Sequence, residues 1–340
     1  MSGIKLLLYW LSGLFLAVSQ ANATIDVSLQ MQLGNPSNAS ADAINHAHYL
    51  IQLSAEALDY SDDLHEPNWA SWDLTSGDIG SSGRGDFLTD TNLPKTFYWV
   101  KTADYTHSGY DRGHMCPSGD RTDTVADNDL VFRMSNILPQ APDNNQGPWE
   151  KLETYCRTLA QAGNELLIIC GPNGFAGARI NTNGPVFIPA YTWKIIVVVT
   201  NGTGTALSRI TEATRVIAVN LPNVAGIRSV AWTNYLTSVN TIQDRTGYTF
   251  FTALPAAVAA ALRAKVDGVS APPTLSITFS GARQIISWPS SATGYSLQQN
   301  TNFNAVNWTA YVGTVGSNST TMTVTNSLPA GNVFYRLYHP

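Results

Sequence analysis

One stretch near the middle of the sequence gathers residue types that could act together in proton transfer and metal binding. His114 lies in a glycine-containing turn beside Arg112, and an imidazole can move a proton near neutral pH. Asn145 offers a neutral oxygen of the kind that a hard cation prefers. Glu153 and Arg157 follow four residues apart, on one side of an expected helix. A base, a metal ligand, a carboxylate and guanidiniums together predict chemistry on a phosphodiester.

Each of these residues also has a purely structural interpretation. A histidine in a glycine-rich turn commonly makes a structural hydrogen bond, and an asparagine at a helix start commonly caps that helix. Glu153 and Arg157 could form a solvated ion pair worth about 0.2–0.5 kcal/mol. The residues taken singly therefore leave catalysis and structure open.

The elements that must position these residues have mixed helix and strand signals. Continuous apolar runs at 165–170 and 193–199 predict buried strands. The segment 145–162 predicts a helix, with Asn144 or Asn145 as its cap, a proline in the first turn and a glycine after its end. This pattern predicts an α+β fold with a mixed or antiparallel sheet.

Composition sets the class of protein. The chain has 340 residues, 44% of them hydrophobic and 13% charged, with a net charge of −5 and three cysteines. These values exclude a disordered chain and a disulfide-dense scaffold, and no Lys/Arg run marks a basic nucleic-acid coat. The acidic balance predicts weak, salt-sensitive binding of any polyanion.

The last seventy residues differ from the rest. From 271 to 340 the only Lys, Arg, Asp or Glu residues are Arg283 and Arg336, and two prolines at 272–273 end a helix-like stretch. Short alternating segments follow, which predict a small all-β sandwich of fibronectin-III-like appearance. Its aromatic residues could stack on a ligand or pack in a core; they are Trp288, Tyr295 and Trp308.

The N-terminus resembles a secretory signal. Lys5 precedes an apolar run of residues 6–18, and Ala21-Asn22-Ala23 supplies a cleavage site. The run is shorter than the ~20 residues of a membrane span, which favours a cleaved signal over the alternative of a retained anchor. No later segment is apolar enough to predict a span. We therefore expect a signal peptide at 1–23, a first domain at 24–270, a second at 271–340, and a secreted or periplasmic bacterial protein.

The cysteines would enter an oxidising compartment if the chain is secreted. Three thiols cannot all pair within one chain, and Cys116 follows His114 by only two residues. Cys156 and Cys170 could form a disulfide or both be buried thiols, and we expect thiols.

The motif Asp111-Arg-Gly-His114, followed by Met-Cys-Pro-Ser118, resembles the signature of the DNA/RNA non-specific endonuclease family, the ββα-metal or His-Me finger nucleases. The resemblance covers roughly 30–265. Further segments fall at family spacing: Arg84…Phe87…Asp90, Ser135-Asn136-Ile-Leu-Pro-Gln140, Asn145-Gln-Gly-Pro-Trp149…Glu153…Arg157 and Thr246-Gly-Tyr-Thr-Phe-Phe251. One departure is Ile242-Gln-Asp-Arg-Thr246, where many relatives have Ile-Glu; it concerns local packing.

The resemblance implies a role for each matching residue. It implies a ββα-metal fold that cleaves DNA and RNA with little sequence choice, leaving 5′-phosphates, with Mg²⁺ as cofactor or Mn²⁺ or another divalent cation in its place. The implied roles are His114 as general base, Asn145 as the one protein ligand of the metal, Glu153 as the group that orients water around it, Arg84, Arg112 and Arg157 as phosphate clamps, Asn136 as the support of the His114 loop, and Asp111 as a loop-fixing residue.

Two competing interpretations remain. The chain could be a catalytically silent relative that binds nucleic acid, although His114, Asn145, Glu153 and Arg112 are intact. Alternatively the C-terminal module could dominate by binding carbohydrate or a surface. The sequence leaves open whether the protein is a monomer or a homodimer.

Overall fold

The structure is a computed structural model that describes residues 29–181, 184–268 and 273–338. The predicted signal peptide at 1–23 lies outside the described residues, and so does the predicted boundary after residue 270. The chain divides into two compact units, with the division between Ala264 and Lys265. No helix in the described ranges is long and apolar enough to cross a membrane.

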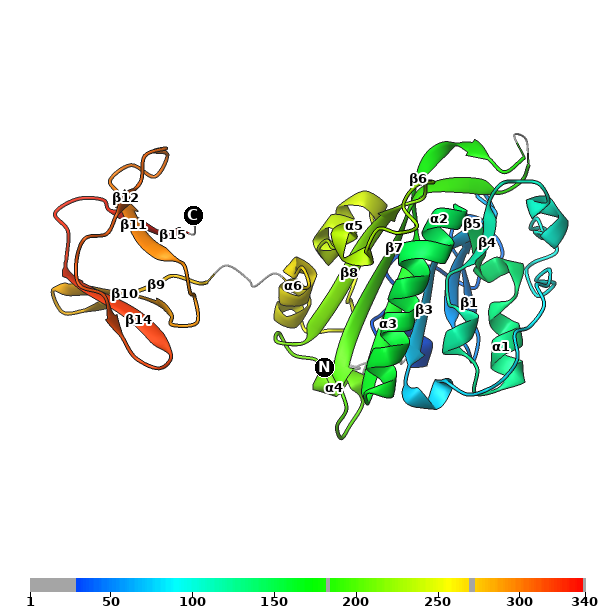
Figure 1. Ribbon diagram of the computed structural model, residues 1–340, viewed down its shortest axis with the longest axis horizontal. Coiled ribbons are helices and arrows are strands. Elements are labelled where there is room, and N and C mark those ends of the chain that lie inside the picture. The colour runs from blue at the N-terminus through cyan, green and yellow to red at the C-terminus, as the bar shows by residue number, and fades with distance from the viewer. Residues whose placement is uncertain (1–28, 182–183, 269–272, 339–340) are drawn as a thin grey trace, which may run out of the picture. The chain divides into compact units, whose positions relative to one another are not determined.

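The first unit is built on a six-stranded sheet in which every pair of neighbouring strands is antiparallel (Figure 1). The prediction of an α+β fold is therefore confirmed, and the sheet is antiparallel. In spatial order its strands are β1 (Tyr49–Gln52), β2 (Ala57–Ser61), β3 (Glu66–Leu74), β6 (Asn164–Arg179), β7 (Phe187–Thr200) and β8 (Arg215–Pro222).

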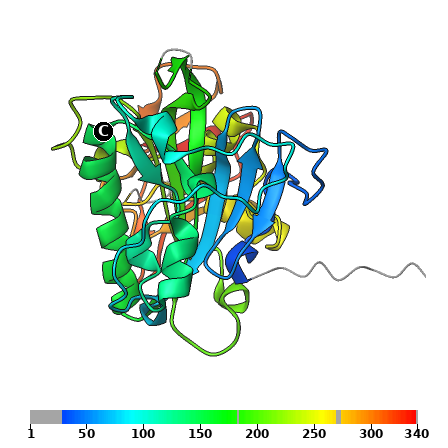
Figure 2. The same cartoon turned by 90° about the vertical axis from the view of Figure 1, so that its right-hand side faces the viewer.

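Helices and short helical turns cover both faces of this sheet (Figure 2). The helices are α1 (Val125–Val131), α2 (Pro142–Asn144), α3 (Glu150–Gln161), α4 (Ala206–Arg209), α5 (Val239–Thr246) and α6 (Ala256–Ala264). Between α2 and α3 lies a π-helical segment, η6 (Asn145–Trp149), and 3₁₀ turns occur at Leu29–Met31, Ser76–Asp78, Thr102–Tyr105, Ser118–Asp120, Met134–Asn136 and Trp232–Tyr235.

The two central strands explain why their sequences read as continuous apolar runs. Along β6, Leu167 and Ile169 face one core, while Leu166, Ile168 and Cys170 face the other. Successive side chains of a strand point to opposite faces, so a sheet covered on both faces must be apolar at every position. The predicted strands at 165–170 and 193–199 are confirmed, although both strands extend beyond the apolar runs.

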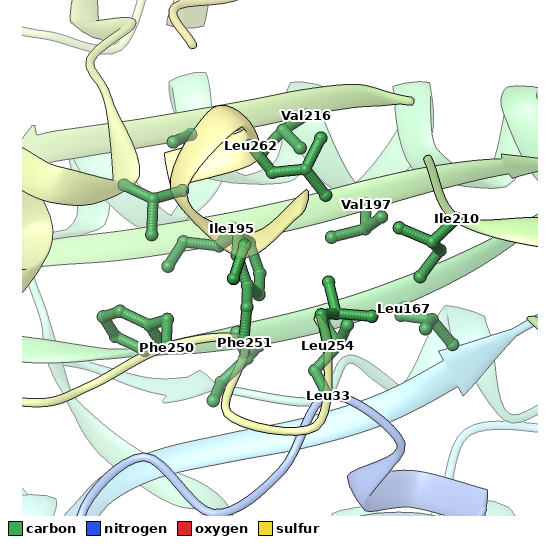
Figure 3. Close-up of a cluster of buried hydrophobic side chains, with 14 of the residues drawn as sticks. Leu33, Leu167, Ile195, Val197, Ile210, Val216, Phe250, Phe251, Leu254 and Leu262 are labelled. Carbon is green, nitrogen blue, oxygen red and sulfur yellow. The ribbon is translucent and has the colours of Figure 1, made fainter. Parts of the chain in front are cut away.

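One core lies between the sheet and helices α5 and α6. Figure 3 shows part of this cluster, with Phe250, Phe251 and Leu254 packed against strand residues such as Ile195 and Val197. The Gln243 position, where the sequence departs from many relatives, keeps an acceptor: its Oε1 accepts a hydrogen bond from the Phe250 backbone N–H at 2.9 Å. The departure therefore does not disturb this core.

The opposite core carries the candidate site. It packs α3, through Leu152, Cys156 and Ala160, against the sheet and against a two-stranded ribbon. That ribbon consists of β4 (Asp111–His114) and β5 (Ile137–Gln140). Trp69 is buried in the first core and Trp72 in the second, so both side chains pack in the interior.

The predicted helix at 145–162 has a different beginning. The first turn of α2 starts at Pro142, the π-helical segment η6 interrupts it, and the regular helix α3 spans Glu150–Gln161. Neither predicted cap residue caps the helix: the Asn144 side chain donates to Thr192 Oγ1, and the Asn145 side chain donates to Asp111. The capping prediction is wrong because both amides bond across to other elements.

The second unit contains two small antiparallel sheets, ordered β13-β14-β10-β9 and β12-β11-β15. Trp288 is 4% exposed and lies in the core between them, which confirms core packing for that residue. The strands are β9 (Ser276–Ser280), β10 (Arg283–Pro289), β11 (Ser296–Asn300), β12 (Thr309–Ala310), β13 (Gly316–Ser317), β14 (Thr321–Ser327) and β15 (Phe334–Tyr338).

The three cysteines are buried free thiols, as expected. Burial raises the pKa of Cys156 to about 12 and also raises those of Cys116 and Cys170. A thiol with a raised pKa is a poor nucleophile, so none of the three is suited to covalent catalysis.

Candidate active site

The β4–β5 ribbon holds His114 at the end of its first strand. His114 pairs in register with Ile137, and Gly113 pairs with Leu138. A Cβ on Gly113 would lie 2.3 Å from Gln140 Oε1, so this position requires a glycine. The strands are joined by a long connection through α1 (Val125–Val131) rather than by a tight turn.

The imidazole of His114 packs between two phenylalanine rings. Its ring centroid lies 5.1 Å from that of Phe87 and 4.8 Å from that of Phe132. Burial, followed by the positive charges of Arg84 and Arg112, lowers the pKa of His114 from 6.5 to about 3. The ring is therefore neutral at physiological pH, and a neutral imidazole can accept a proton.

Asn136 fixes the chain that follows His114. Its Nδ2 donates to the backbone oxygens of Cys116 at 2.9 Å and Val131 at 2.8 Å, and its Oδ1 accepts from Cys116 N–H at 3.0 Å. The residue is fully buried. Asn136 thus lies behind the site as a support, away from the surface that a substrate could reach.

The side chain of Asn145 is held by the carboxylate of Asp111 on strand β4. Its Nδ2 donates to Asp111 Oδ2 at 2.9 Å, and Gln146 Nε2 donates to the same oxygen at 2.7 Å. Among the described residues nothing donates to Asn145 Oδ1. The amide is therefore oriented with its oxygen available, which is what a metal ligand requires.

The π-helical segment η6 sets the position of Asn145. Gly147 has φ −118° and ψ −114°, which is not helical, and a Cβ there would lie 2.7 Å from Arg228 Cα. Pro148 follows inside the segment. Single π-helical turns inside α-helices often occur at functional sites.

Glu153, on α3, forms a buried ion pair that the sequence did not reveal. Lys194 Nζ, from β7, lies 3.6 Å from Glu153 Oε1, and the Lys194 side chain is 1% exposed. Its ammonium also lies 4.1 Å from the ring centroid of Trp149 and 5.3 Å from that of Trp72. Burial raises the pKa of Glu153 to about 7, and the charge of Lys194 limits that rise.

Arg157 pairs with Asp120 instead of Glu153. Its NH1 lies 3.0 Å from Asp120 Oδ1, and its NH2 donates to Thr154 Oγ1 at 2.8 Å. The other oxygen of Asp120 accepts from Trp72 Nε1 at 3.1 Å. The interpretation of Glu153 and Arg157 as a solvated ion pair is therefore wrong, because each residue pairs with a buried partner from another element.

Arg84 and Arg112 are exposed guanidiniums at the mouth of the site. Arg112 lies over the ring of Phe87, with its Cζ 4.3 Å from the centroid, and Arg84 lies over Phe132 at 5.0 Å. In the described ranges neither guanidinium forms a salt bridge. Their charges are therefore free to meet an anion.

These side chains surround one cleft of about 410 Å³. The structure brings six of the seven predicted site residues to its lining, and Asn136 lies behind it: the six are Arg84, Arg112, His114, Asn145, Glu153 and Arg157. A neighbouring hollow of about 500 Å³ shares Arg84, Arg112 and Asn145 and adds Tyr110. The two hollows together provide a path for an extended anionic ligand.

The donor set fits a divalent cation with one protein ligand. Within the described ranges the amide oxygen of Asn145 has no hydrogen-bond partner, and no group of three or more His, Cys, Asp or Glu there could hold a metal. Hard cations such as Mg²⁺ keep several waters and bind substrate phosphates beside a small number of protein oxygens. Asn145 alone, with Glu153 nearby in the same cleft, is consistent with such a site.

The amino-acid sequence is similar to those of several known nucleases. The chain is 41% identical to a nuclease of Nostoc sp. over 242 residues, 71% of this chain and 87% of that protein. It is 28% identical to nuclease C1 of Cunninghamella echinulata over 236 residues, covering 65% of this chain and 86% of the relative. It is also 28% identical to the human mitochondrial nuclease EXOG over 208 residues, 57% of this chain but only 55% of that relative.

A solved structure has the same fold. A chain in the crystal structure of the EndoG/EndoGI complex superposes with a TM-score of 0.56 at 21% identity, covering 66% of this chain and 91% of that one. The sequence model of the DNA/RNA non-specific endonucleases matches residues 29–257, which contain the whole cleft. The chain therefore belongs to the DNA/RNA non-specific endonuclease family, a family of phosphodiester hydrolases.

Proposed function

We propose that the protein is a secreted or periplasmic endonuclease that hydrolyses DNA and RNA with little sequence preference, supported by Mg²⁺ or another divalent cation. The observation that carries the proposal is the cleft in which His114, Asn145 and Glu153 meet three arginines. The apolar run and cleavage site at the N-terminus support export.

His114 is the proposed general base. Its neutral ring takes the proton from the attacking water. In the free protein burial, followed by the charges of Arg84 and Arg112, holds the pKa of His114 low. A phosphodiester bound to the same arginines offsets their charge, so substrate binding raises the proton affinity of His114 when it is needed.

The arginines bind and polarise the phosphate. Arg84 and Arg112 have no carboxylate partner among the described residues, and planar guanidiniums match the non-bridging oxygens of a phosphate. Arg157 is held in place by Asp120, so it presents a fixed charge to the cleft. Positive charge placed before the reaction stabilises the additional negative charge of the transition state.

Asn145 would hold the cation through its oriented amide oxygen. A divalent cation there would supply stabilisation of charge on the phosphate and on the leaving oxygen. Glu153, ionised above its pKa of about 7, accepts hydrogen bonds from water in the cleft and orients it. Asp111 and Lys194 hold Asn145 and Glu153 in place.

The test is cleavage of a supercoiled plasmid and of a long RNA by the purified protein, with Mg²⁺ and with EDTA. We expect nicked and linear plasmid before short fragments, because an endonuclease cuts internally. His114→Ala should lower the rate about 100- to 10,000-fold, whereas His46→Ala, at a half-exposed histidine outside the cleft, should not. An intact plasmid with the unmodified protein would support the silent, nucleic-acid-binding alternative.

A further inference from the structure

The second unit contains a cleft lined entirely by its own residues. Its volume is about 570 Å³, within the roughly 300–1,000 Å³ of small-ligand sites. Five amide side chains and five hydroxyl side chains line it, with only two apolar residues and no charged group. Such a lining can donate and accept hydrogen bonds everywhere but offers no ion pair.

The cleft arises because the layer between the two sheets changes from apolar to polar. In one sheet Ile286 pairs with Val324, and both are fully buried in the core. Two residues along each strand, on the same face, Gln284 pairs with Asn326. Inward-facing positions of a sandwich normally fill the core, so an amide pair there requires another explanation.

The facing sheet makes the same change at the same end. Leu297 pairs with Leu337 in the core, and the next inward-facing pair is Gln299 with Tyr335. All four polar residues of these two pairs line the cleft. Two sheets thus converge on one hollow with polar side chains at positions where the fold needs none.

Hydrogen bonds within the lining hold some of these groups and leave others available. Gln284 Nε2 donates to Tyr335 Oη at 2.7 Å across the two sheets, and Tyr311 Oη donates to Asn326 Oδ1 at 2.6 Å. Within the described part of the chain, Asn326 Nδ2 and the side-chain amide of Asn307 have no partner. The lining is therefore held in shape by its own hydrogen bonds and keeps amide groups available to a ligand.

The uncharged lining of the cleft argues against a polyanion as its ligand. Between residues 273 and 338 the only Lys, Arg, Asp or Glu residues are two arginines. Neither Arg283 nor Arg336 lines the cleft, and Arg336 is engaged by Gln298 at 2.9 Å and by the ring of Trp308 at 4.6 Å. Binding of nucleic acid depends on phosphate neutralisation, which this cleft does not offer.

We propose that this cleft binds a neutral glycan, so that the second unit attaches the nuclease to uncharged polysaccharide. Each sugar hydroxyl both donates and accepts, which matches the amides and hydroxyls of the lining, and the absence of charged lining residues matches an uncharged ligand. The proposal stands independently of the nuclease function, because it uses only residues of the second unit.

Affinity electrophoresis of the full-length protein provides the test. Gels would contain laminarin, galactomannan or amylopectin as neutral probes, with alginate and DNA as charged probes. We expect retardation by at least one neutral polysaccharide. Gln299→Ala and Asn307→Ala should each raise Kd about two- to tenfold, as expected for one lost hydrogen bond.

Gln298→Ala is the matched control, because Gln298 is adjacent in the strand and faces the other side of the sheet. It should bind like the unmodified protein, and thermal melting would show that all variants fold. The proposal is overturned if no neutral probe retards the protein, if only alginate or DNA does, or if the Gln299→Ala/Asn307→Ala double variant binds undiminished.

Discussion

Lys194 Nζ lies 3.6 Å from Glu153 Oε1, joining the central strand β7 to helix α3 beneath the cleft. The pair is almost fully buried, and the ammonium is also enclosed by the rings of Trp149 and Trp72. Removing one member of a buried pair leaves an uncompensated charge, so Lys194 controls the ionisation of Glu153. We therefore predict that Lys194 influences the reaction although it does not line the cleft.

Replacement of Lys194 should therefore shift the pH profile. In Lys194→Met the pKa of Glu153 should rise above its present value of about 7, because the opposing positive charge is lost. We expect kcat/KM to fall about tenfold at pH 7 and to recover toward pH 9. Lys95→Met, at an exposed lysine, is the charge-matched control. Equal loss at every pH would show a packing effect instead.

The buried, neutral His114 should make the stability of the folded protein depend on pH. Folding lowers the pKa of His114 from 6.5 to about 3, so between these values the unfolded chain binds more protons than the folded protein. Its contribution to stability is therefore complete above pH 6.5 and decreases as the pH falls toward 3. The Tm of the unmodified protein should drop more between pH 7 and pH 4 than that of His114→Asn. Parallel Tm curves would contradict the buried, neutral state of His114.

Much of the site could be predicted because its chemistry lies in local motifs. His114 and Asn145 have residue types and spacing that suit a base and a metal ligand, and both line the cleft. Lys194 and Asp120 were missed, because their partners lie on other elements and only the packing of α3 on the sheet brings them together. A lysine inside the apolar run of β7 was the one available signal.

Strands were predicted correctly where consecutive residues are buried and apolar, and their extensions were missed where the side chains are exposed. The apolar run of β6 ends at Cys170, but the strand continues to Arg179 with mostly exposed side chains, which carry no periodic signal. The helix start was misplaced because Gly147 adopts a non-helical conformation that depends on the approach of Arg228. Such tertiary contacts are not encoded in local propensity.

Asp111 should increase the affinity for the metal through Asn145, without contacting the metal itself. In Asp111→Asn the hydrogen bond from Asn145 Nδ2 loses its charged acceptor, so the amide oxygen is less firmly oriented. Groups that orient a metal ligand typically contribute 10- to 100-fold in metal affinity. Mg²⁺ titration of plasmid cleavage should show a higher half-saturating concentration, with Asp63→Asn, at an exposed carboxylate, as control. An unchanged titration would rule out this orienting role.

Gly147→Ala should damage the site through the backbone. The added Cβ would lie 2.7 Å from Arg228 Cα and 2.8 Å from its carbonyl oxygen, so η6 must shift and Asn145 must move with it. Overpacking of this kind costs about 1–3 kcal/mol. We expect a lower Tm and a higher half-saturating Mg²⁺ concentration. Gly331→Ala should show neither change, because a Cβ there meets no atom within 4 Å. Full activity with an unchanged Tm would be the contrary result.

Deletion of residues 272–340 should leave nuclease activity intact. The hydrophobic clusters of the first unit contain buried residues only up to Leu262, while the cluster of the second unit begins at Leu275, so each unit has a core of its own. The cleft with His114 and Asn145 draws every lining residue from the first unit. We expect the truncated protein to cleave plasmid with the kcat/KM of the full chain while losing retardation by neutral polysaccharide. A soluble, folded truncation without activity would show that the second unit contributes to catalysis.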